Sequence, residues 1–178
     1  MSRSALHPVL LIRCILIVCT LLSVGACKTS RKTESTAPKA ADTRESVFRR
    51  SIVDYAAKYK GARYTPAGKS PGSGFDCSGF TSYVMDHFHI ELSPAAREQV
   101  KQGKSKRIED ARPGDLIFFR RSPKEPIFHV SLVKSNTGKS LIVIHSTTSR
   151  GVIEEDVLNS TYWKQYIDSV RDVVSQKY

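Results

Sequence analysis

The chain has 178 residues, of which 40% are hydrophobic and 25% charged, with a formal net charge of +11. That is enough apolar material for one globular domain with appendages. Residues 27–50 carry a net charge of +4, nearly as much as the +5 of the much longer stretch 51–178. A nucleic-acid-binding protein is expected to show a basic stripe with interleaved aromatic residues, and the absence of one excludes that class. The charge instead fits a basic segment beside a membrane or an anionic polymer, or a solvated tether.

The N-terminus has the pattern of a secretory signal. Arg3 and Arg13 precede an apolar run over residues 14–24, which is shorter than the roughly 20 apolar residues that a membrane-spanning helix needs. The run ends in Leu-Ser-Val-Gly-Ala-Cys at residues 22–27, which resembles a bacterial lipoprotein box. The resemblance implies a signal peptide over residues 1–26, cleavage before Cys27 and lipidation of that cysteine. The alternative is an ordinary signal peptide that is cut nearby.

Residues 27–45 read as a flexible tether. They are rich in Lys, Ser, Thr, Ala and Arg and show no apolar periodicity, so they cannot bury enough surface to offset the entropy lost on ordering. Lys28 follows the anchoring cysteine, and in Gram-negative lipoproteins a residue other than aspartate there points to the outer membrane. The expected location is the cell envelope, with a lipid anchor on the periplasmic face of the outer membrane and the folded domain over residues 46–178.

The first half of this domain has helical patterns. Asp42 and Glu45 have the spacing of a capping box, and Gly61 is placed to end the helix that follows. Residues 61–75 are rich in Gly and Pro and predict a loop. Asp76 then stands as the N-cap of a second helix. Its expected buried stripe is Phe80, Val84 and Phe88.

Further along, Ser93-Pro94 predicts the start of a third helix that Gly103 ends. Pro113-Gly114-Asp115 predicts a turn, after which the apolar period changes from helical to strand-like. The predicted strands are 116–120, 128–134, 141–146, 151–154 and 166–174. A hairpin turn at 136–138 joins two of them. Helices followed by short strands indicate an α+β fold with an antiparallel sheet.

Cys77 is the candidate nucleophile. Cys14 and Cys19 lie in the signal, and Cys27 and Cys77 have such different surroundings that they indicate two separate roles rather than a disulfide. As the first residue of a helix, Cys77 meets unpaired N–H groups that favour a thiolate. Such a position with a histidine nearby can lower a cysteine pKa to roughly 3.5–7.5. The alternative is a structural buried cysteine.

Two histidines in apolar strands are the candidate partners of this thiol. Alternation places the side chain of His129 on the strand face opposite Phe128 and Val130. His145 has a similar position in the next predicted strand. On adjacent antiparallel strands one histidine would act as the base and the other would fix its tautomer. Either one alone is equally well explained as a histidine with a satisfied polar partner in the core.

A metal site is not expected. His87 and His89 lie near the end of the second predicted helix, but residues two apart do not face each other on a helix. The chain contains no CxxC or HExxH spacing.

Five blocks together resemble the NlpC family of papain-like bacterial cell-wall peptidases, and most closely its Gram-negative lipoprotein endopeptidases. The blocks are Gly61-Ala62-Arg63-Tyr64, Asp76-Cys77-Ser78-Gly79-Phe80, residues 112–119 (Arg-Pro-Gly-Asp-Leu-Ile-Phe-Phe), His129-Val130 and Val143-Ile144-His145-Ser146. The resemblance implies a papain-like α+β fold, with N-terminal helices packed on a five- to six-stranded antiparallel sheet. It also implies that Cys77 is the nucleophile, His129 the general base and His145 the orienting residue. Tyr64, Asp76 and Ser78 would contact the substrate.

The implied activity is hydrolysis of peptide stems or crosslinks of peptidoglycan by a Cys-His-His triad, with no cofactor. Two other readings stay open: a non-catalytic murein-binding lipoprotein, and an acyl transferase on the same fold. Relatives usually follow the second helix with Leu-Pro-Arg and two small hydroxyl residues, whereas here the stretch 92–99 carries Arg97 in a displaced position. The sequence does not distinguish a D,D-crosslink from a γ-D-glutamyl bond to the diamino acid.

Overall fold

A six-stranded antiparallel sheet with helices packed against it forms the body of the protein. The computed structural model describes residues 40–177. The sheet order is β3-β8-β4-β5-β6-β7, and every pair of neighbours is antiparallel. Its strands are β3 (Lys104–Lys106), β4 (Leu116–Phe119), β5 (His129–Asn136), β6 (Leu141–Thr147), β7 (Gly151–Asp156) and β8 (Ile167–Asp172). The predicted fold class is confirmed.

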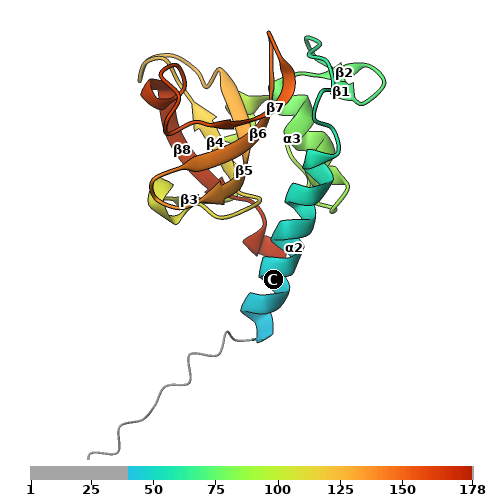
Figure 1. Ribbon diagram of the computed structural model, residues 1–178, viewed down its shortest axis with the longest axis vertical. Coiled ribbons are helices and arrows are strands. Elements are labelled where there is room, and N and C mark those ends of the chain that lie inside the picture. The colour runs from blue at the N-terminus through green and yellow to red at the C-terminus, as the bar shows by residue number, and fades with distance from the viewer. Residues whose placement is uncertain (1–39, 178) are drawn as a thin grey trace, which may run out of the picture. The chain divides into compact units, whose positions relative to one another are not determined.

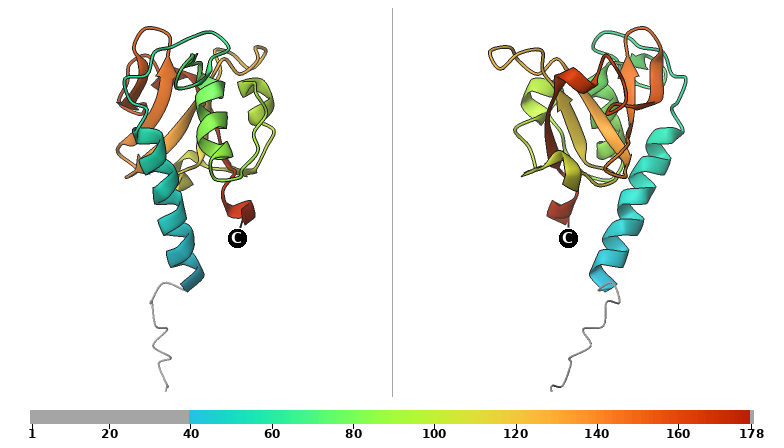
Figure 2. Two further views of the ribbon diagram at one scale, coloured as in Figure 1. Left: turned by 90° about the vertical axis from the view of Figure 1, so that its right-hand side faces the viewer. Right: turned by 60° about the vertical axis from the view of Figure 1, so that its left-hand side comes forward.

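Two longer helices, α2 (Ala40–Ala57) and α3 (Cys77–Asp86), lie on one side of the sheet (Figure 1). A short hairpin of β1 (Lys69–Ser70) and β2 (Gly74–Phe75) connects them. The remaining helical elements are α4 (Ala96–Gln99) and the 3₁₀ turns Ile108–Asp110, Lys164–Tyr166 and Ser175–Lys177. The first turns of α2 extend past the end of the sheet (Figure 2).

The sheet is buried on both faces, which is why β4 reads Leu-Ile-Phe-Phe without a polar residue. Leu116 and Phe118 pack on the helix side with Phe80 and Val84. The alternate residues of β4 face a second apolar cluster. That cluster contains Ile117, Phe119, Val133, Leu141, Val143, Val157, Trp163 and Val170. The segment that follows β7 therefore covers the face of the sheet that α2 and α3 leave open.

The five predicted strands are present with shifted ends, and two elements were missed. Lys104–Lys106 forms β3 through its pairing with β8, although its Lys-Ser-Lys sequence has no apolar pattern. The predicted loop 61–75 contains the β1–β2 hairpin. The turn at 113–115 is confirmed by the hydrogen bond from Asp115 N–H to the Arg112 carbonyl. The hairpin between β5 and β6 is confirmed as well.

The predicted capping box at the start of α2 is wrong. The helix begins at Ala40, so Asp42 lies inside it and residues 40–45 of the expected tether are helical. Glu45 instead accepts hydrogen bonds from Arg49, one turn later, and from Arg112 near β4. The helix ends at Ala57, and tighter turns continue the chain to Gly61. The expected signal, Cys27 and tether residues 27–39 lie outside the described residues.

The predicted helix from Ser93 to Gly103 is wrong, because only Ala96–Gln99 is α-helical and its N-cap is Ala95. The side chain of Gln99 donates to the Ser93 carbonyl at 2.8 Å, and the Ser93 N–H donates to Gln102 at 2.8 Å. The backbone N–H and carbonyl groups of Ser93 are therefore hydrogen-bonded by side chains and not by a helix. Over residues 40–177, no helix is long and apolar enough to cross a membrane.

Candidate active site

Cys77 is the first residue of α3, as predicted. Asp76 caps the helix: its Oδ1 atom accepts the Gly79 N–H at 2.6 Å and the Ser78 hydroxyl at 3.1 Å. Gly79 is required here for space, since a Cβ at this position would collide with the Gly68 carbonyl oxygen. The loop before the hairpin therefore packs directly against the turn of helix that carries the thiol.

The expectation that the helix N-terminus lowers the pKa of Cys77 is wrong for the resting protein. Burial raises the pKa of this thiol to about 11, and the charge of Asp76 also raises it. Backbone hydrogen bonds, the strongest from Val130, oppose the increase without cancelling it. Loss of solvation thus outweighs the helix terminus. Cys77 is a neutral thiol at neutral pH, and it needs a base to become a nucleophile.

The two predicted histidines are brought together. Antiparallel pairing of β5 with β6 places His129 Nε2 3.0 Å from His145 Nδ1, and both rings are buried. The Ser131 hydroxyl lies 2.9 Å from the same His145 nitrogen. The pairing expected for His129 and His145 is therefore confirmed.

One detail of the predicted alternation is wrong. His129 and Val130 do face opposite sides of the sheet, since Val130 packs in the helix-side cluster. Phe128, however, lies on the same side as His129, and its ring stacks on Trp163. The reason is that β5 begins at His129, so the two-residue period does not extend back to residue 128.

Both histidines are neutral at neutral pH. Burial, assisted by His145, holds the pKa of His129 well below its ordinary value. Burial lowers the pKa of His145 to about 4, although the Glu155 carboxylate opposes that shift. An uncharged thiol and two uncharged imidazoles therefore make up the resting site.

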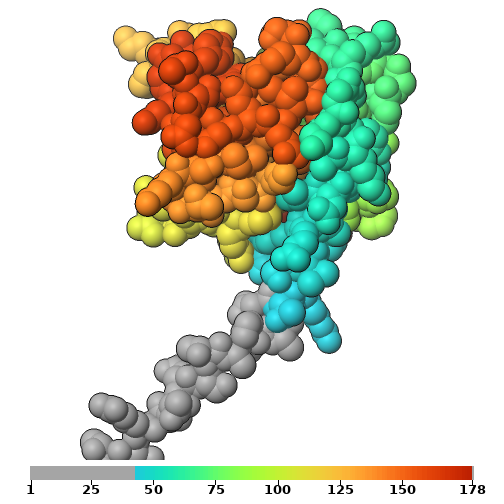
Figure 3. All heavy atoms as spheres, in the orientation of Figure 1, coloured from blue at the N-terminus to red at the C-terminus, as the bar shows by residue number. Residues whose placement is uncertain are grey.

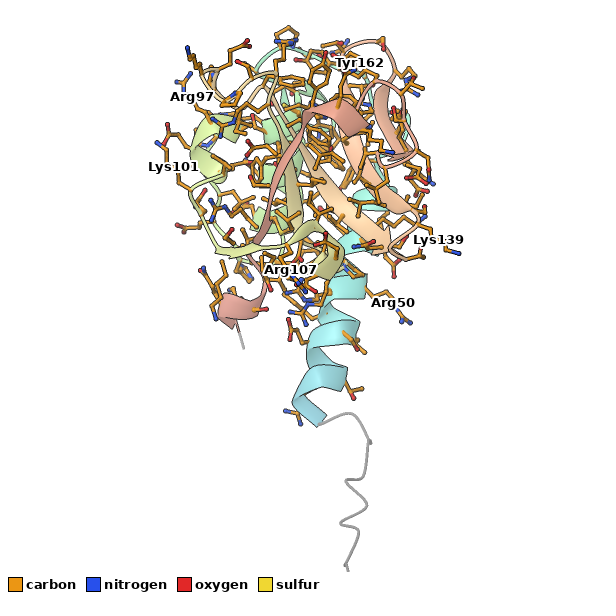
Figure 4. The ribbon with its side chains drawn as sticks, turned by 90° about the vertical axis from the view of Figure 1, so that its left-hand side faces the viewer. Arg50, Arg97, Lys101, Arg107, Lys139 and Tyr162 are labelled. Atoms are coloured by element: carbon orange, nitrogen blue, oxygen red, sulfur yellow. The ribbon has the colours of Figure 1, made fainter. Side chains whose placement is uncertain are left out.

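A cleft of about 580 Å³ opens beside these groups. Its walls include Tyr64, Cys77, Arg121, Phe128, His129, the loop 146–150, Glu155, Tyr162 and Trp163. Tyr162 lies at the end of the molecule opposite the start of α2 (Figure 4). Burial raises the pKa of Tyr64, and the charges of an ionised Cys77 and of Asp76 raise it further, so this phenol lies close to both residues. The cleft therefore brings the candidate nucleophile and base together with one of the predicted substrate-contacting residues.

Two of the predicted substrate-contacting residues flank Cys77 without lining this cleft. Asp76 and Ser78 are not among the cleft's lining residues; Ser78 is buried, and its hydroxyl donates to Asp76. Within residues 40–177, Cys77 and His129 line the same cleft, but no hydrogen bond joins them. Displaced Arg97 is exposed and ion-paired with Glu98.

The loop that carries Tyr64 is held from two sides. Gly61 N–H donates to the Val152 carbonyl, and Val152 N–H donates to the Ala62 carbonyl, so the loop is paired with β7. On its other side, Phe75 N–H donates to the Arg63 carbonyl. The space-filling view shows the segment after α2 packed against the strands near residue 150 (Figure 3). Tyr64 is thus positioned by backbone contacts with residues distant in sequence.

Sequence reasoning assigned no role to three residues around the histidine pair. Ser131 is two residues after His129, so strand alternation could have predicted that it lies on the same face of the sheet. Glu155 was lost because the predicted strand ended at residue 154, two residues before the end of β7. Trp163, which stacks on His129 with ring centroids 4.5 Å apart, follows β7 in a segment with no periodic pattern. The position of Trp163 depends on tertiary packing against the sheet.

The histidines of the second predicted helix do not form a metal centre. His87 stacks on Tyr55, with ring centroids 3.8 Å apart. Among residues 40–177, no group of three potential metal ligands is present.

The fold and site define an α+β protein in which a thiol and a histidine line a cleft and a second histidine is buried behind the first. A family model described as the NlpC/P60 family matches residues 61–172, and the chain belongs to this family. The matched region contains Tyr64, Cys77 and both histidines.

Two curated relatives and one solved structure illustrate the match. The "Gamma-DL-glutamyl hydrolase" of Bacillus subtilis is 33% identical over 63% of this chain and 27% of its own length. The "Probable endopeptidase NlpC" of Escherichia coli is 30% identical over 64% of this chain and 71% of its own length. The NlpC/P60 domain of "peptidoglycan hydrolase SagA" has 30% identity and a TM-score of 0.57, covering 68% of this chain and 95% of that one. The chain thus spans only about a quarter of the Bacillus protein.

Proposed function

We propose that the protein is a cysteine peptidase that hydrolyses amide bonds in the peptide stems or crosslinks of peptidoglycan. The observation that supports this most directly is the cleft in which Cys77 meets His129 backed by His145. The family and the names of its members support the substrate class, since SagA is titled a peptidoglycan hydrolase and the Bacillus relative a glutamyl hydrolase.

In the proposed reaction, His129 takes the thiol proton of Cys77 as the sulfur attacks the scissile carbonyl carbon. The carbonyl π electrons move to oxygen, and the backbone N–H of Cys77 with the Tyr64 hydroxyl stabilises that oxyanion. Collapse of the intermediate breaks the C–N bond, and His129 gives its proton to the leaving amine. Water then attacks the thioester with His129 as base, which releases the carboxylate product and restores the thiol.

Because the resting thiol and imidazoles are uncharged, proton transfer accompanies attack rather than preceding it. A base that is neutral at neutral pH is ready to accept the proton. His145 would hold the ring of His129 in position through the 3.0 Å contact between Nε2 and Nδ1.

The test uses purified sacculi with wild-type protein, a Cys77→Ala variant and a Lys139→Ala control. Lys139 is exposed and lies well away from Tyr162 (Figure 4). Wild type and the control should release soluble muropeptides, and Cys77→Ala should release none above background. Mass spectrometry of the products identifies the bond cut. Undiminished release by Cys77→Ala would refute the peptidase proposal, and products extended by an added amine would indicate acyl transfer.

The lipid anchor is part of the proposal and is supported by the residues before Cys27. Attachment through this cysteine would hold the domain at a membrane surface beside the polymer it cuts. A Cys27→Ala form should leave the membrane fraction and keep its activity on sacculi in solution. Unchanged membrane association of that form would contradict lipidation at Cys27.

A further inference from the structure

Glu155 occupies the far side of the histidine pair from the thiol. It lies on β7, two residues after Ile153, the residue opposite His145 in the β6–β7 register. Its Oε2 atom is 3.4 Å from His145 Nε2. That nitrogen is buried and makes no hydrogen bond to any residue between 40 and 177. The Glu155 carboxylate thus places an acceptor oxygen opposite this nitrogen.

The same carboxylate oxygen is fixed in place by two other donors. Trp163 Nε1–H donates to Glu155 Oε2 at 3.1 Å, and Arg150 Nη2 donates to it from the loop before β7. The Ser160 hydroxyl contacts the other oxygen, Oε1, at 3.4 Å. Since the indole and the guanidinium are donors only, the oxygen that faces His145 is held as an acceptor.

An acceptor at that point selects the tautomer of His145. The ring nitrogen facing the oxygen must carry the proton, so a neutral His145 is protonated on Nε2 and has its lone pair on Nδ1. The single lone pair on Nδ1 then faces His129 Nε2, 3.0 Å away, and is shared with the Ser131 hydroxyl at 2.9 Å; a second lone pair on His129 Nε2 would repel it. His129 is protonated on Nε2 as a result, and its lone pair lies on Nδ1. That ring nitrogen is the one left to receive the thiol proton.

We infer that Glu155 is a positioning residue, which fixes the tautomers of His145 and His129 by presenting an acceptor oxygen to His145 Nε2. The inference rests on the proposed role of His129 as the base for Cys77. It assigns Glu155 no contact with the reacting atoms: the carboxylate acts through His145, and His145 acts through His129.

The charges around Glu155 favour an acceptor role over a charge role. Arg150 offsets its negative charge directly, and Arg121 lines the same cleft. Asp76 lies on the other side, next to Cys77 and Tyr64, and acts on the thiol rather than on the histidines. Arg150 thus offsets part of the charge of Glu155, while Oε2 still presents a lone pair to His145.

The first measurement is of the tautomers themselves, by ¹⁵N NMR of the imidazole rings in the purified full chain at neutral pH. The wild type should show both His129 and His145 protonated on Nε2. A Glu155→Ala variant should lose the single tautomer at His145. Protonation of His145 on Nδ1 in the wild type would overturn the inference. This readout needs no turnover, so it remains valid even if the peptidase proposal fails.

The second measurement compares Glu155→Ala, Glu155→Gln and the control Glu154→Ala. Glu154 pairs with Lys60 and Lys134, away from the histidines, so its loss tests general destabilisation. In Glu155→Gln, Trp163 and Arg150 should keep the amide oxygen where the carboxylate oxygen was. For each variant we would measure kcat, KM and the rate at which iodoacetamide alkylates Cys77.

We expect Glu155→Ala to lower kcat and the alkylation rate about 10- to 100-fold with little change in KM, as for other groups that orient an active-site histidine. Glu155→Gln and Glu154→Ala should keep most of both rates. Wild-type rates in Glu155→Ala would overturn the inference, as would a rise in KM alone, which would mean that Glu155 binds substrate. So would a Gln variant as impaired as the Ala variant, because the charge would then be the active feature.

Discussion

Asp76 performs a local structural task that has an electrostatic consequence for its neighbour. Its carboxylate caps α3 through the Gly79 N–H, and its negative charge raises the pKa of Cys77. A neutral acceptor would cap the helix equally well. The carboxylate therefore opposes ionisation of the thiol, which suggests a reason for its presence other than capping, such as the substrate contact that the family resemblance implies.

An Asp76→Asn variant separates these roles. The amide oxygen should keep the Gly79 hydrogen bond, so the free energy of unfolding should change by less than about 0.5 kcal/mol. The thiol pKa should fall, so alkylation of Cys77 by iodoacetamide at pH 8 should be about two- to tenfold faster. Hydrolysis should nevertheless be slower if the carboxylate contacts substrate.

The matched control is Asp86→Asn, at the opposite end of the same helix and exposed. It should leave stability, alkylation and hydrolysis unchanged. Equal alkylation rates for wild type and Asp76→Asn would show that the Asp76 charge does not act on the thiol.

How far each site residue was predictable depends on whether its position is set locally. Asp76 and Cys77 were found because an N-cap and the first turn of a helix are specified within a few residues. His129 and His145 were found because each stands in a clear strand pattern, and neighbouring strands usually pair. Glu155 acts only through the β6–β7 register, which single-strand periodicity does not supply.

At the scale of elements, α2 is fastened to the sheet by one buried arginine. Arg49 donates to Asp115, ahead of β4, at 2.7 Å and to Asp172, at the end of β8, at 2.6 Å. It also pairs with Glu45 on its own helix. Three segments far apart in the chain therefore meet at one guanidinium, whose planar fork of donors suits several carboxylates at once.

Replacing Arg49 by Met should be strongly destabilising. The variant leaves buried Asp115 with Lys106, and buried Asp172 with Arg112 and a more distant Lys106, as the remaining basic partners, and losing one partner of a buried ion pair costs about 3–5 kcal/mol. The measurement is the free energy of unfolding in urea. Arg50→Met is the control, since Arg50 is exposed and points away from the body (Figure 4). Equal stability of the two variants would show that the network does not fasten α2.

The same network explains where sequence reasoning about elements failed. Glu45 looked like the third residue of a capping box but serves Arg49 and Arg112 instead. β3 has no apolar pattern and exists only because β8 offers it a partner. The contacts of Glu45 with Arg112 and of β3 with β8 join residues more than sixty positions apart, and such tertiary contacts override local propensity.

For the molecule as a whole, keeping two neutral histidines in the core makes stability depend on pH. An unfolded histidine has a pKa near 6.5, whereas that of folded His145 is about 4. Between these values the unfolded chain binds more protons, so the stabilisation is fully present above pH 6.5 and is lost as the pH falls towards 4. For His145 alone the loss is on the order of 3 kcal/mol.

The free energy of unfolding should therefore decrease between pH 6.5 and 4, and the decrease should be smaller in His145→Asn, which has no imidazole to protonate at that site. Burial raises the pKa of Asp115, so this residue changes the pH dependence of stability in the opposite direction, and equally in both proteins. The difference in slope between wild type and His145→Asn therefore reports on the histidine. His89→Asn, at an exposed position, should keep the wild-type slope. An identical slope in His145→Asn would mean that burial of the neutral pair does not govern acid stability.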